Sequence, residues 1–171
     1  MTAPAPIIVL MGVAGCGKST IGEALSTTLG WPFRDADSFH PESNVAKMSR
    51  GEALTDDDRK PWLAAIAAWI DARQASHAPA IVSCSALKRA YRDIIVGGRP
   101  GVYLVHLAGT QDLIGARMAA RRNHFMPTSL LQSQFATLEP PQPHEALIID
   151  VDAAPQAIAQ RIITSLGVVR P

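Results

Sequence analysis

The sequence lacks the features that mark several large classes of protein. It has only two cysteines, Cys16 and Cys84, too few and too far apart for a zinc site or a disulfide framework. Its net charge of +1 gives no excess positive charge to attract nucleic acid or a membrane surface. The apolar runs are too short to cross a bilayer, and the first residues do not read as a secretion signal. We therefore expect a cytoplasmic protein with no nucleic-acid and no membrane partner.

The composition is that of an ordinary globular domain. The chain has 171 residues, of which 47% are hydrophobic, and this length is enough to bury a core. No internal repeat, low-complexity tract or linker divides it. The sequence therefore predicts one domain over residues 1–171.

Short apolar runs alternate along the chain with longer stretches whose apolar residues recur at helical spacing. The expected strands cover residues 6–11, 31–35, 80–84, 102–107 and 146–151. The expected helices cover residues 18–29, 61–75, 87–96, 110–122 and 154–166. This alternation is typical of βαβ units and predicts an α/β fold, a parallel sheet with helices on both faces. Ligands of such sheets bind at the carboxyl ends of the strands.

Residues 12–20, GVAGCGKST, fit the phosphate-binding pattern G-x-x-x-x-G-K-[ST] between an expected strand and an expected helix. The glycines allow a tight turn in which successive N–H groups point at a phosphate chain. The helix that begins near Lys18 adds the positive end of its dipole. Lys18 can bridge the outer phosphates, and Ser19 can place its hydroxyl on Mg²⁺.

A glycine-rich turn that arose by chance is the alternative, but the flanking strand and helix favour phosphate binding. Cys16 stands at a free position of the loop, where the backbone matters more than the side chain, and we expect no redox role for it. The sequence therefore predicts that the protein binds a nucleoside triphosphate. The loop leaves open whether the protein hydrolyses the triphosphate, transfers a phosphoryl group from it, or only senses it.

Asp35 ends the second expected strand and Asp37 comes just after it, so both emerge at the same sheet edge as the phosphate loop. Residues two apart on an extended strand share a face, so both can point toward the phosphates. One carboxylate would orient magnesium-bound water, and the other would accept the proton of an attacking hydroxyl. An N-cap or Asx-turn role for Asp37 is the structural alternative. We interpret Asp150, at the end of the last strand, as part of a loop near the nucleotide base rather than as a metal ligand.

Cationic and polar side chains are dense in two further segments. The long insertion over residues 40–63 holds His40, Asn44, Lys47, Arg50, Arg59 and Lys60. After the third strand, Lys88 and Arg92 stand four residues apart, on one face of an expected helix. Most basic residues on helix surfaces are simply solvated, but a clamp for an anionic substrate is the functional interpretation.

A third cluster consists of Arg117, Arg121 and Arg122, on a helix that breaks near Pro127. A second short amphipathic stretch follows. We expect a helical hairpin, a lid over approximately residues 117–140, that closes over the phosphates and excludes water. It would bring arginines to the charge on the transferred group.

Together these segments resemble the bacterial-type gluconokinases, P-loop kinases related to shikimate kinases and nucleoside monophosphate kinases. The matching segments are MGVAGCGKST, DADSFHPESNVAKMSRGEALTDDDRKPWL, CSALKRAYRD, RMAARRNHFMPTSLLQSQFATLEPP and DVDAAP. They run in matching order from about Ile8 to Ile163. The phosphate loop alone is unspecific, whereas the block that begins at His40 and the CSALKRAYRD segment are far more diagnostic.

The resemblance implies ATP-dependent, Mg²⁺-supported phosphorylation of D-gluconate to 6-phosphogluconate by a homodimer. It also implies a P-loop fold with a five-stranded parallel sheet of order 2-3-1-4-5 and a helical lid. The implied ATP site is Gly12, Val13, Ala14, Gly15, Cys16, Gly17, Lys18, Ser19, Thr20, Arg117, Arg121, Asp152 and Pro155. The implied catalytic residues are Lys18, Asp37 and Arg121, and the metal residues are Ser19 and Asp35. The implied gluconate site is Asp37, His40, Lys47, Arg59, Lys88 and Arg92.

Two other interpretations compete with this one. The first is a kinase for another small anionic acceptor, such as shikimate or a nucleoside monophosphate. A shikimate kinase would be shorter between the second and third strands and would lack LTDDDRKPWL. The second is a non-catalytic nucleotide-binding module, against which the Asp pair and the lid arginines argue because a sensor needs no proton acceptor.

Overall fold

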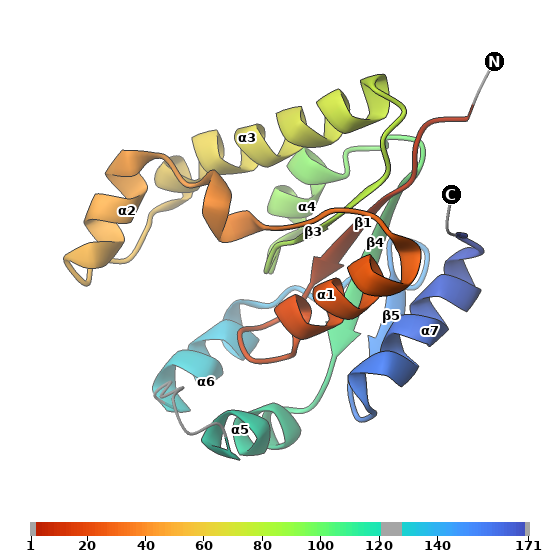
Figure 1. The fold of residues 1–171 in the computed structure, drawn as a ribbon. Coiled ribbons are helices and arrows are strands. Elements are labelled where there is room, and N and C mark those ends of the chain that lie inside the picture. The colour runs from red at the N-terminus through yellow and green to blue at the C-terminus, as the bar shows by residue number, and fades with distance from the viewer. Residues whose placement is uncertain (1–2, 121–127, 170–171) are drawn as a thin grey trace.

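The computed structural model describes residues 3–120 and 128–169. In these residues a five-stranded parallel sheet has the order β2-β3-β1-β4-β5, with helices on both faces (Figure 1). The predicted α/β class and the sheet order that the resemblance implied are therefore confirmed.

The elements follow the expected order, with two additions. The strands are β1 (Ile7–Met11), β2 (Phe33–Asp35), β3 (Ala80–Ser83), β4 (Val102–Ala108) and β5 (Leu147–Asp150). The helices are α1 (Lys18–Leu29), α2 (Glu42–Ser49), α3 (Asp56–Ala75), α4 (Arg89–Ile95), α5 (Gln111–Ala120), α6 (Thr128–Thr137) and α7 (Pro155–Leu166). A 3₁₀ turn, η1 (Ala36–Phe39), follows β2, and neither this turn nor α2 was expected from the apolar pattern.

Helix α3 begins five residues before the expected position 61. Thr55 caps it: its Oγ accepts from the N–H of Asp58, and the Asp58 carboxylate accepts from the N–H of Thr55. Three aspartates in the first turn also complement the helix dipole. The apolar spacing and Pro61 both suggested a start at residue 61, because the first turn of α3 is polar. The capping box shows that the helix begins directly after Thr55.

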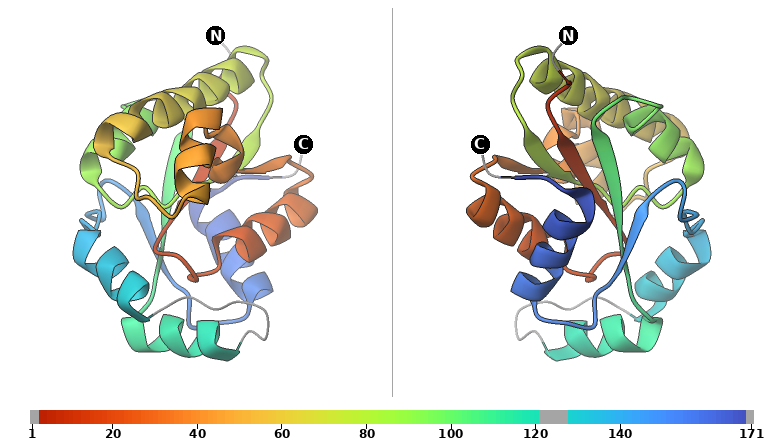
Figure 2. Two further views of the ribbon diagram at one scale, coloured as in Figure 1. Left: turned by 90° about the vertical axis from the view of Figure 1, so that its left-hand side faces the viewer. Right: turned by 90° about the vertical axis from the view of Figure 1, so that its right-hand side faces the viewer.

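Strand β1 is buried on both of its faces, as an uninterrupted apolar run predicts. Ile8 and Leu10 pack with buried residues of α1 and α7, whereas Ile7 and Val9 pack with those of α3 and α4. The two side views show these helix pairs on opposite faces of the sheet (Figure 2). The two cores hold the carboxyl end of β1, and hence the phosphate loop, in place.

The carboxyl ends of the strands point toward α5 and α6 (Figure 1). The expected lid spans the end of α5, residues 121–127 and α6, so Arg121 and Arg122 lie outside the described residues. Among the residues that are described, no helix has both the length and the apolar character needed to span a membrane.

Candidate active site

The phosphate loop follows β1 directly and turns into α1. The backbone of Gly15 has φ +82°, and a Cβ at this position would lie 2.5 Å from Met118 Sδ of α5. Lys18 folds back over the loop, where its Nζ donates to the carbonyls of Gly12 at 2.9 Å and Val13 at 3.1 Å. Gly17, with φ 104°, precedes the first turn of α1. The segment therefore has the expected form of a glycine-rich turn that leads into a helix N-terminus.

A pocket of about 380 Å³ opens beside this loop, and we call it the acceptor pocket. Its walls are formed by Ala14, Gly15, Gly17, Lys18, Ser19, Thr20, Asp35, Ala36, Asp37, Trp62, Ser83, Cys84 and Ser85. Residues that follow three neighbouring strands thus meet in one space. The structure brings Asp37 to the same pocket as Lys18, although the two are 19 residues apart in the sequence.

Asp35 ties the two sides of the pocket together. Its Oδ2 accepts from Ser19 Oγ at 3.2 Å, and its Oδ1 accepts from the backbone N–H of Asp37 at 2.9 Å. Asp37 lies in η1 rather than on an extended strand, so the argument from strand alternation was wrong for this pair. The turn, capped by the Asp35 carboxylate, is what places both residues on the pocket wall.

Ser19 and Asp35 offer a hydroxyl and a carboxylate, the oxygen ligands that Mg²⁺ prefers. Within residues 3–120 and 128–169, no group of three or more His, Cys, Asp or Glu side chains is arranged to hold a metal ion by itself.

A second pocket, of about 250 Å³, lies on the other side of the phosphate loop, and we call it the nucleoside pocket. Its walls are Gly15, Cys16, Gly17, Thr20, Ile21, Arg117, Ala153, Pro155 and Ile158. Arg117 also reaches Asp152 at 3.9 Å. The Asp150 carboxylate accepts from the N–H of Asp152 and so shapes the turn before α7. The structure thus gathers Arg117, Asp152 and Pro155 beside the loop.

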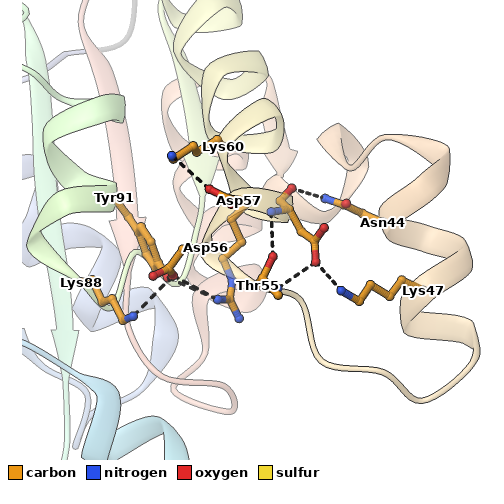
Figure 3. A network of polar contacts seen from close by, with 10 residues as sticks. Asn44, Lys47, Thr55, Asp56, Asp57, Lys60, Lys88 and Tyr91 are labelled. Atoms are coloured by element: carbon orange, nitrogen blue, oxygen red, sulfur yellow. Dashed lines mark hydrogen bonds and ion pairs between the residues drawn. The ribbon is translucent and has the colours of Figure 1, made fainter.

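The cations predicted for the acceptor stand outside the acceptor pocket. Among the described residues, its walls include none of His40, Lys47, Arg59, Lys88 and Arg92. Four of these five belong to polar contacts around the N-terminus of α3, drawn in part in Figure 3.

The first set of contacts is the Asp56 cluster, formed by Asp56, Arg59, Lys88 and Tyr91. Figure 3 labels Asp56, Lys88 and Tyr91 of this cluster. The Asp56 carboxylate accepts from Tyr91 Oη at 2.5 Å and lies 3.4 Å from Lys88 Nζ and 3.6 Å from Arg59. The hydrogen bond from Tyr91 lowers the pKa of Asp56, and the positive charge of Lys88 lowers it further. Tyr91 and Asp56 raise the pKa of Lys88. The Asp56 carboxylate thus forms ion pairs with two cations, Lys88 and Arg59, that come from different parts of the chain.

The second set is the Asp58 cluster, formed by Asn44, Lys47, Thr55 and Asp58. Figure 3 labels Asn44, Lys47 and Thr55 of this cluster. Lys47 Nζ lies 2.6 Å from Asp58 Oδ2, and this hydrogen bond, with that of Thr55, lowers the pKa of Asp58 to about 2. Buried Asn44 donates to the carbonyl of Asp58 at 2.8 Å. The cluster fixes α2 to the first turn of α3.

His40 is linked both to this cluster and to the pocket wall. Its Nδ1 lies 3.3 Å from Asn44 Nδ2, and its ring stacks on Trp62 at 4.4 Å. Trp62, which lines the acceptor pocket, is itself fixed by a hydrogen bond to the carbonyl of Ala36. Burial lowers the pKa of His40, with Arg59 in the same direction and Asp37 opposing it. His40 therefore supports the wall in the described arrangement.

Arg92 has a different environment from the one expected. It is 2% exposed, its Nε lies 2.6 Å from Glu145, and its Nη1 donates to the carbonyls of Ala86 and Leu87. Lys88 and Arg92 do not share a helical face, because α4 begins at Arg89 and Lys88 is an extended N-cap residue. The structure thus gives Arg92 a supporting place under the loop that carries Lys88.

The comparisons with known proteins agree with this geometry. The family model described as "Shikimate kinase" matches residues 14–167. The gluconokinase of Gluconobacter oxydans is 41% identical over 157 residues, which cover 91% of this chain and 88% of that protein. The thermoresistant gluconokinase of Escherichia coli is 43% identical over 148 residues, 85% of each chain. The chain belongs to the gluconokinase family.

Solved structures place this family member among the P-loop kinases. A gluconokinase structure from Sinorhizobium meliloti is 44% identical, has a TM-score of 0.81, and covers 98% of this chain and 94% of that one. A sugar kinase from Janibacter is 45% identical with a TM-score of 0.85, covering 96% and 95%. A shikimate kinase from Aquifex aeolicus, 16% identical with a TM-score of 0.64, shares the fold alone.

Sequence reasoning missed part of the pocket wall in this gluconokinase-family chain. The missed wall residues of the acceptor pocket are Trp62, Ser83, Cys84 and Ser85. Their position in the sequence could have indicated them, because Ser83 ends β3, Cys84 and Ser85 follow it, and Trp62 lies in the long insertion. Burial raises the pKa of the Cys84 thiol to about 12, and burial also raises the pKa of Cys16 despite nearby Lys18. Both thiols therefore stay protonated, as a packing role requires.

Proposed function

We propose that this protein transfers the terminal phosphoryl group of ATP to D-gluconate and forms 6-phospho-D-gluconate. The single observation that carries the proposal is the acceptor pocket, in which Asp37 and the phosphate-loop residues Lys18 and Ser19 line one space. Family membership supports both ATP and gluconate as substrates.

The proposed chemistry needs a proton acceptor and stabilised charge. Asp37 takes the proton of the gluconate hydroxyl as its oxygen bonds to the terminal phosphorus, and the bond from that phosphorus to the ADP oxygen breaks. The N–H groups of the loop and Lys18 stabilise the charge on the phosphates. Arg121, outside the described residues, is proposed as a further positive charge at the transferred group.

Mg²⁺ is proposed as the metal ion, held by Ser19 and Asp35 together with the phosphates. When bound, it neutralises charge on the phosphate oxygens. The hydrogen bond between Ser19 and Asp35 supports this assignment, because two oxygens 3.2 Å apart are close enough to bind the same cation.

The two pockets suggest where each substrate lies. We assign the nucleoside to the pocket with Arg117 and Pro155, next to Asp152, and the acceptor to the pocket with Asp37. Gluconate is an open-chain polyol with one carboxylate, so its site needs positive charge at one end. Lys88 and Arg59, which stand outside the pocket walls and pair with Asp56, are the proposed partners of that carboxylate, with Lys47 and His40 nearer α2. Arg92 is not included, because it is buried, and Glu145 and two carbonyls occupy its guanidinium.

Three further features remain proposals: the homodimer that the resemblance implied, and the cytoplasmic location and the single domain with a lid over approximately residues 117–140 that the sequence predicted. Sedimentation of the purified chain tests the first of these. A dimer mass at micromolar concentration is expected, and a monomer mass would contradict it.

The function is tested by ADP release measured with D-gluconate, shikimate and nucleoside monophosphates in parallel. Turnover with gluconate, and 6-phosphogluconate identified by mass spectrometry, is the expected result. Turnover with another acceptor but not with gluconate would replace the substrate. Tight ATP binding without ADP release in the presence of any acceptor would instead favour the nucleotide-binding module.

A further inference from the structure

Helix α6 contacts the phosphate loop through one specific hydrogen bond. The backbone N–H of Ala14 donates to Oε1 of Gln134 at 2.7 Å, across 120 residues of sequence. Ala14 lines the acceptor pocket but not the nucleoside pocket, so this contact lies on the acceptor side of the loop. The N–H groups of such loops donate hydrogen bonds to phosphates. Gln134 therefore accepts from a backbone N–H whose position is expected to change when the nucleotide binds.

The segment that follows Gln134 ends on the loop that carries Lys88. The N–H of Glu139 donates to the carbonyl of Leu87 at 2.8 Å, and Oε1 of Glu139 accepts from the N–H of Arg89 at 2.8 Å. These two bonds hold the backbone on both sides of Lys88. Any shift of Glu139 therefore moves the residue proposed to meet the acceptor carboxylate.

The link between the two ends is short and rigid. The N–H of Leu138 donates to the carbonyl of Gln134 at 2.9 Å, so a single helical turn connects the two anchor points. Leu138 packs against both hydrophobic cores.

The receiving loop is also tightly held. Ala86 has a left-handed backbone, with φ 47°, and buried Arg92 holds its carbonyl and that of Leu87. The N–H of Gly12 donates to the carbonyl of Ser85 at 3.2 Å. Because the carbonyls of Ser85, Ala86 and Leu87 are all hydrogen-bonded, we expect this loop to move as a unit when Glu139 shifts.

We propose that Gln134 and Glu139 are positioning residues that couple the phosphate loop to the Lys88 loop, so that each substrate raises the affinity for the other. The proposal rests on the proposed function, since it takes gluconate as the acceptor near Lys88. Neither side chain has to touch a substrate for this role. A merely structural role would change stability but not the mutual dependence of the two affinities.

The test is titration calorimetry of a non-hydrolysable ATP analogue, with and without saturating D-gluconate. In the unchanged protein gluconate lowers the analogue Kd by about fivefold or more, the lower end of typical coupling. In Gln134→Ala and in Glu139→Ala this factor falls below about twofold, while the Kd of each ligand alone changes little. The double variant behaves like either single one, because both belong to one link.

Two control variants separate coupling from loss of packing. Gln132→Ala removes an exposed glutamine from the same helix and keeps the full coupling factor. Glu139→Gln keeps an oxygen that accepts from Arg89 N–H, so it retains most of the coupling. If Glu139→Ala does not fold, the pair Glu139→Gln and Gln134→Ala still decides the matter.

Three outcomes overturn the proposal: no coupling in the unchanged protein, full coupling in Gln134→Ala, or equal loss in Gln132→Ala. These outcomes are distinct from failure of the proposed function, which the ADP-release assay detects as absence of gluconate turnover in the unchanged protein. Coupling can therefore fail while turnover persists.

Discussion

At the residue scale, the polar side chains around the pocket are held by their neighbours. Asp35 accepts from Ser19 and from the backbone of Asp37, so one carboxylate fixes both the edge of the phosphate loop and the turn with the proposed base. Asp56 and Asp58, two residues apart at the start of α3, each hold a different set of cations. The aspartates thus determine where the positive charges lie.

The Asp58 contact predicts a specific dependence of stability on pH. The folded-state pKa of about 2 lies below the usual 3.8, so this group stabilises the fold fully above about pH 4. That contribution disappears as the pH falls toward 2. Thermal melts of the unchanged protein and of Asp58→Asn should therefore differ most at pH 5–6 and converge toward pH 2.

Asp57→Asn is the matched control, because Asp57 is 88% exposed and, within the part of the chain that the structure describes, its one ion pair is with Lys60 three residues away. Its melting temperature should stay close to that of the unchanged protein at every pH, lowered at most slightly by the lost interaction of Asp57 with the helix dipole. A gap between Asp58→Asn and the unchanged protein that stays constant down to pH 2 would contradict the assigned role of Asp58.

At the scale of elements, helices and strands with a regular pattern of apolar residues could be predicted from the sequence, whereas a helix without such a pattern could not. Helix α1 has the bounds that apolar spacing indicated, and all five expected strands are present within two residues. Helix α2 was missed because only Asn44 on it is buried, so no apolar stripe marks it. The ion pair of Arg92 with Glu145 was also missed, since its partners are 53 residues apart and local pattern carries no such signal.

Two helical glycines, one on α1 and one on α5, have different surroundings, which predict opposite effects of substitution by alanine. A Cβ at Gly22 would lie 2.4 Å from the ring of Phe33, whereas at Gly115 of α5 its nearest neighbour is a Leu131 methyl at 3.6 Å. Gly22→Ala should destabilise the protein by about 1–3 kcal/mol through overpacking. Gly115→Ala should stabilise it by about 0.5–1 kcal/mol, the usual gain in a helix. Urea unfolding measures both.

Each variant serves as the control for the other. Equal effects of the same sign would show that helix propensity alone decides the outcome, and the close contact between α1 and β2 would then be wrong.

At the scale of the whole molecule, two pockets meet at one loop. Gly15, Gly17 and Thr20 line both of them, so the proposed nucleoside and acceptor approach the phosphate chain from opposite sides. The sequence predicted the loop and the sheet edge. Which cations reach the pocket could not be predicted, because that depends on acids brought in from other elements.

This arrangement predicts that the two sides can be impaired separately. Arg117→Ala, on the nucleoside side, should raise the KM for ATP several-fold and leave that for gluconate nearly unchanged. Lys88→Ala should raise the KM for gluconate more than that for ATP. Steady-state kinetics with each substrate varied in turn makes the comparison, and the reverse pattern would place Lys88 on the nucleotide side.

The most direct test of the account is Asp37→Asn, measured for kcat and, separately, for binding of a non-hydrolysable ATP analogue. Asn keeps the size of the side chain but cannot take a proton, so kcat should fall by roughly two to four orders of magnitude while analogue affinity stays within about twofold. Asp57→Asn, the same change at an exposed site outside the pocket, should leave both unchanged. A kcat for Asp37→Asn equal to that of the unchanged protein would contradict the proposed transfer across the acceptor pocket.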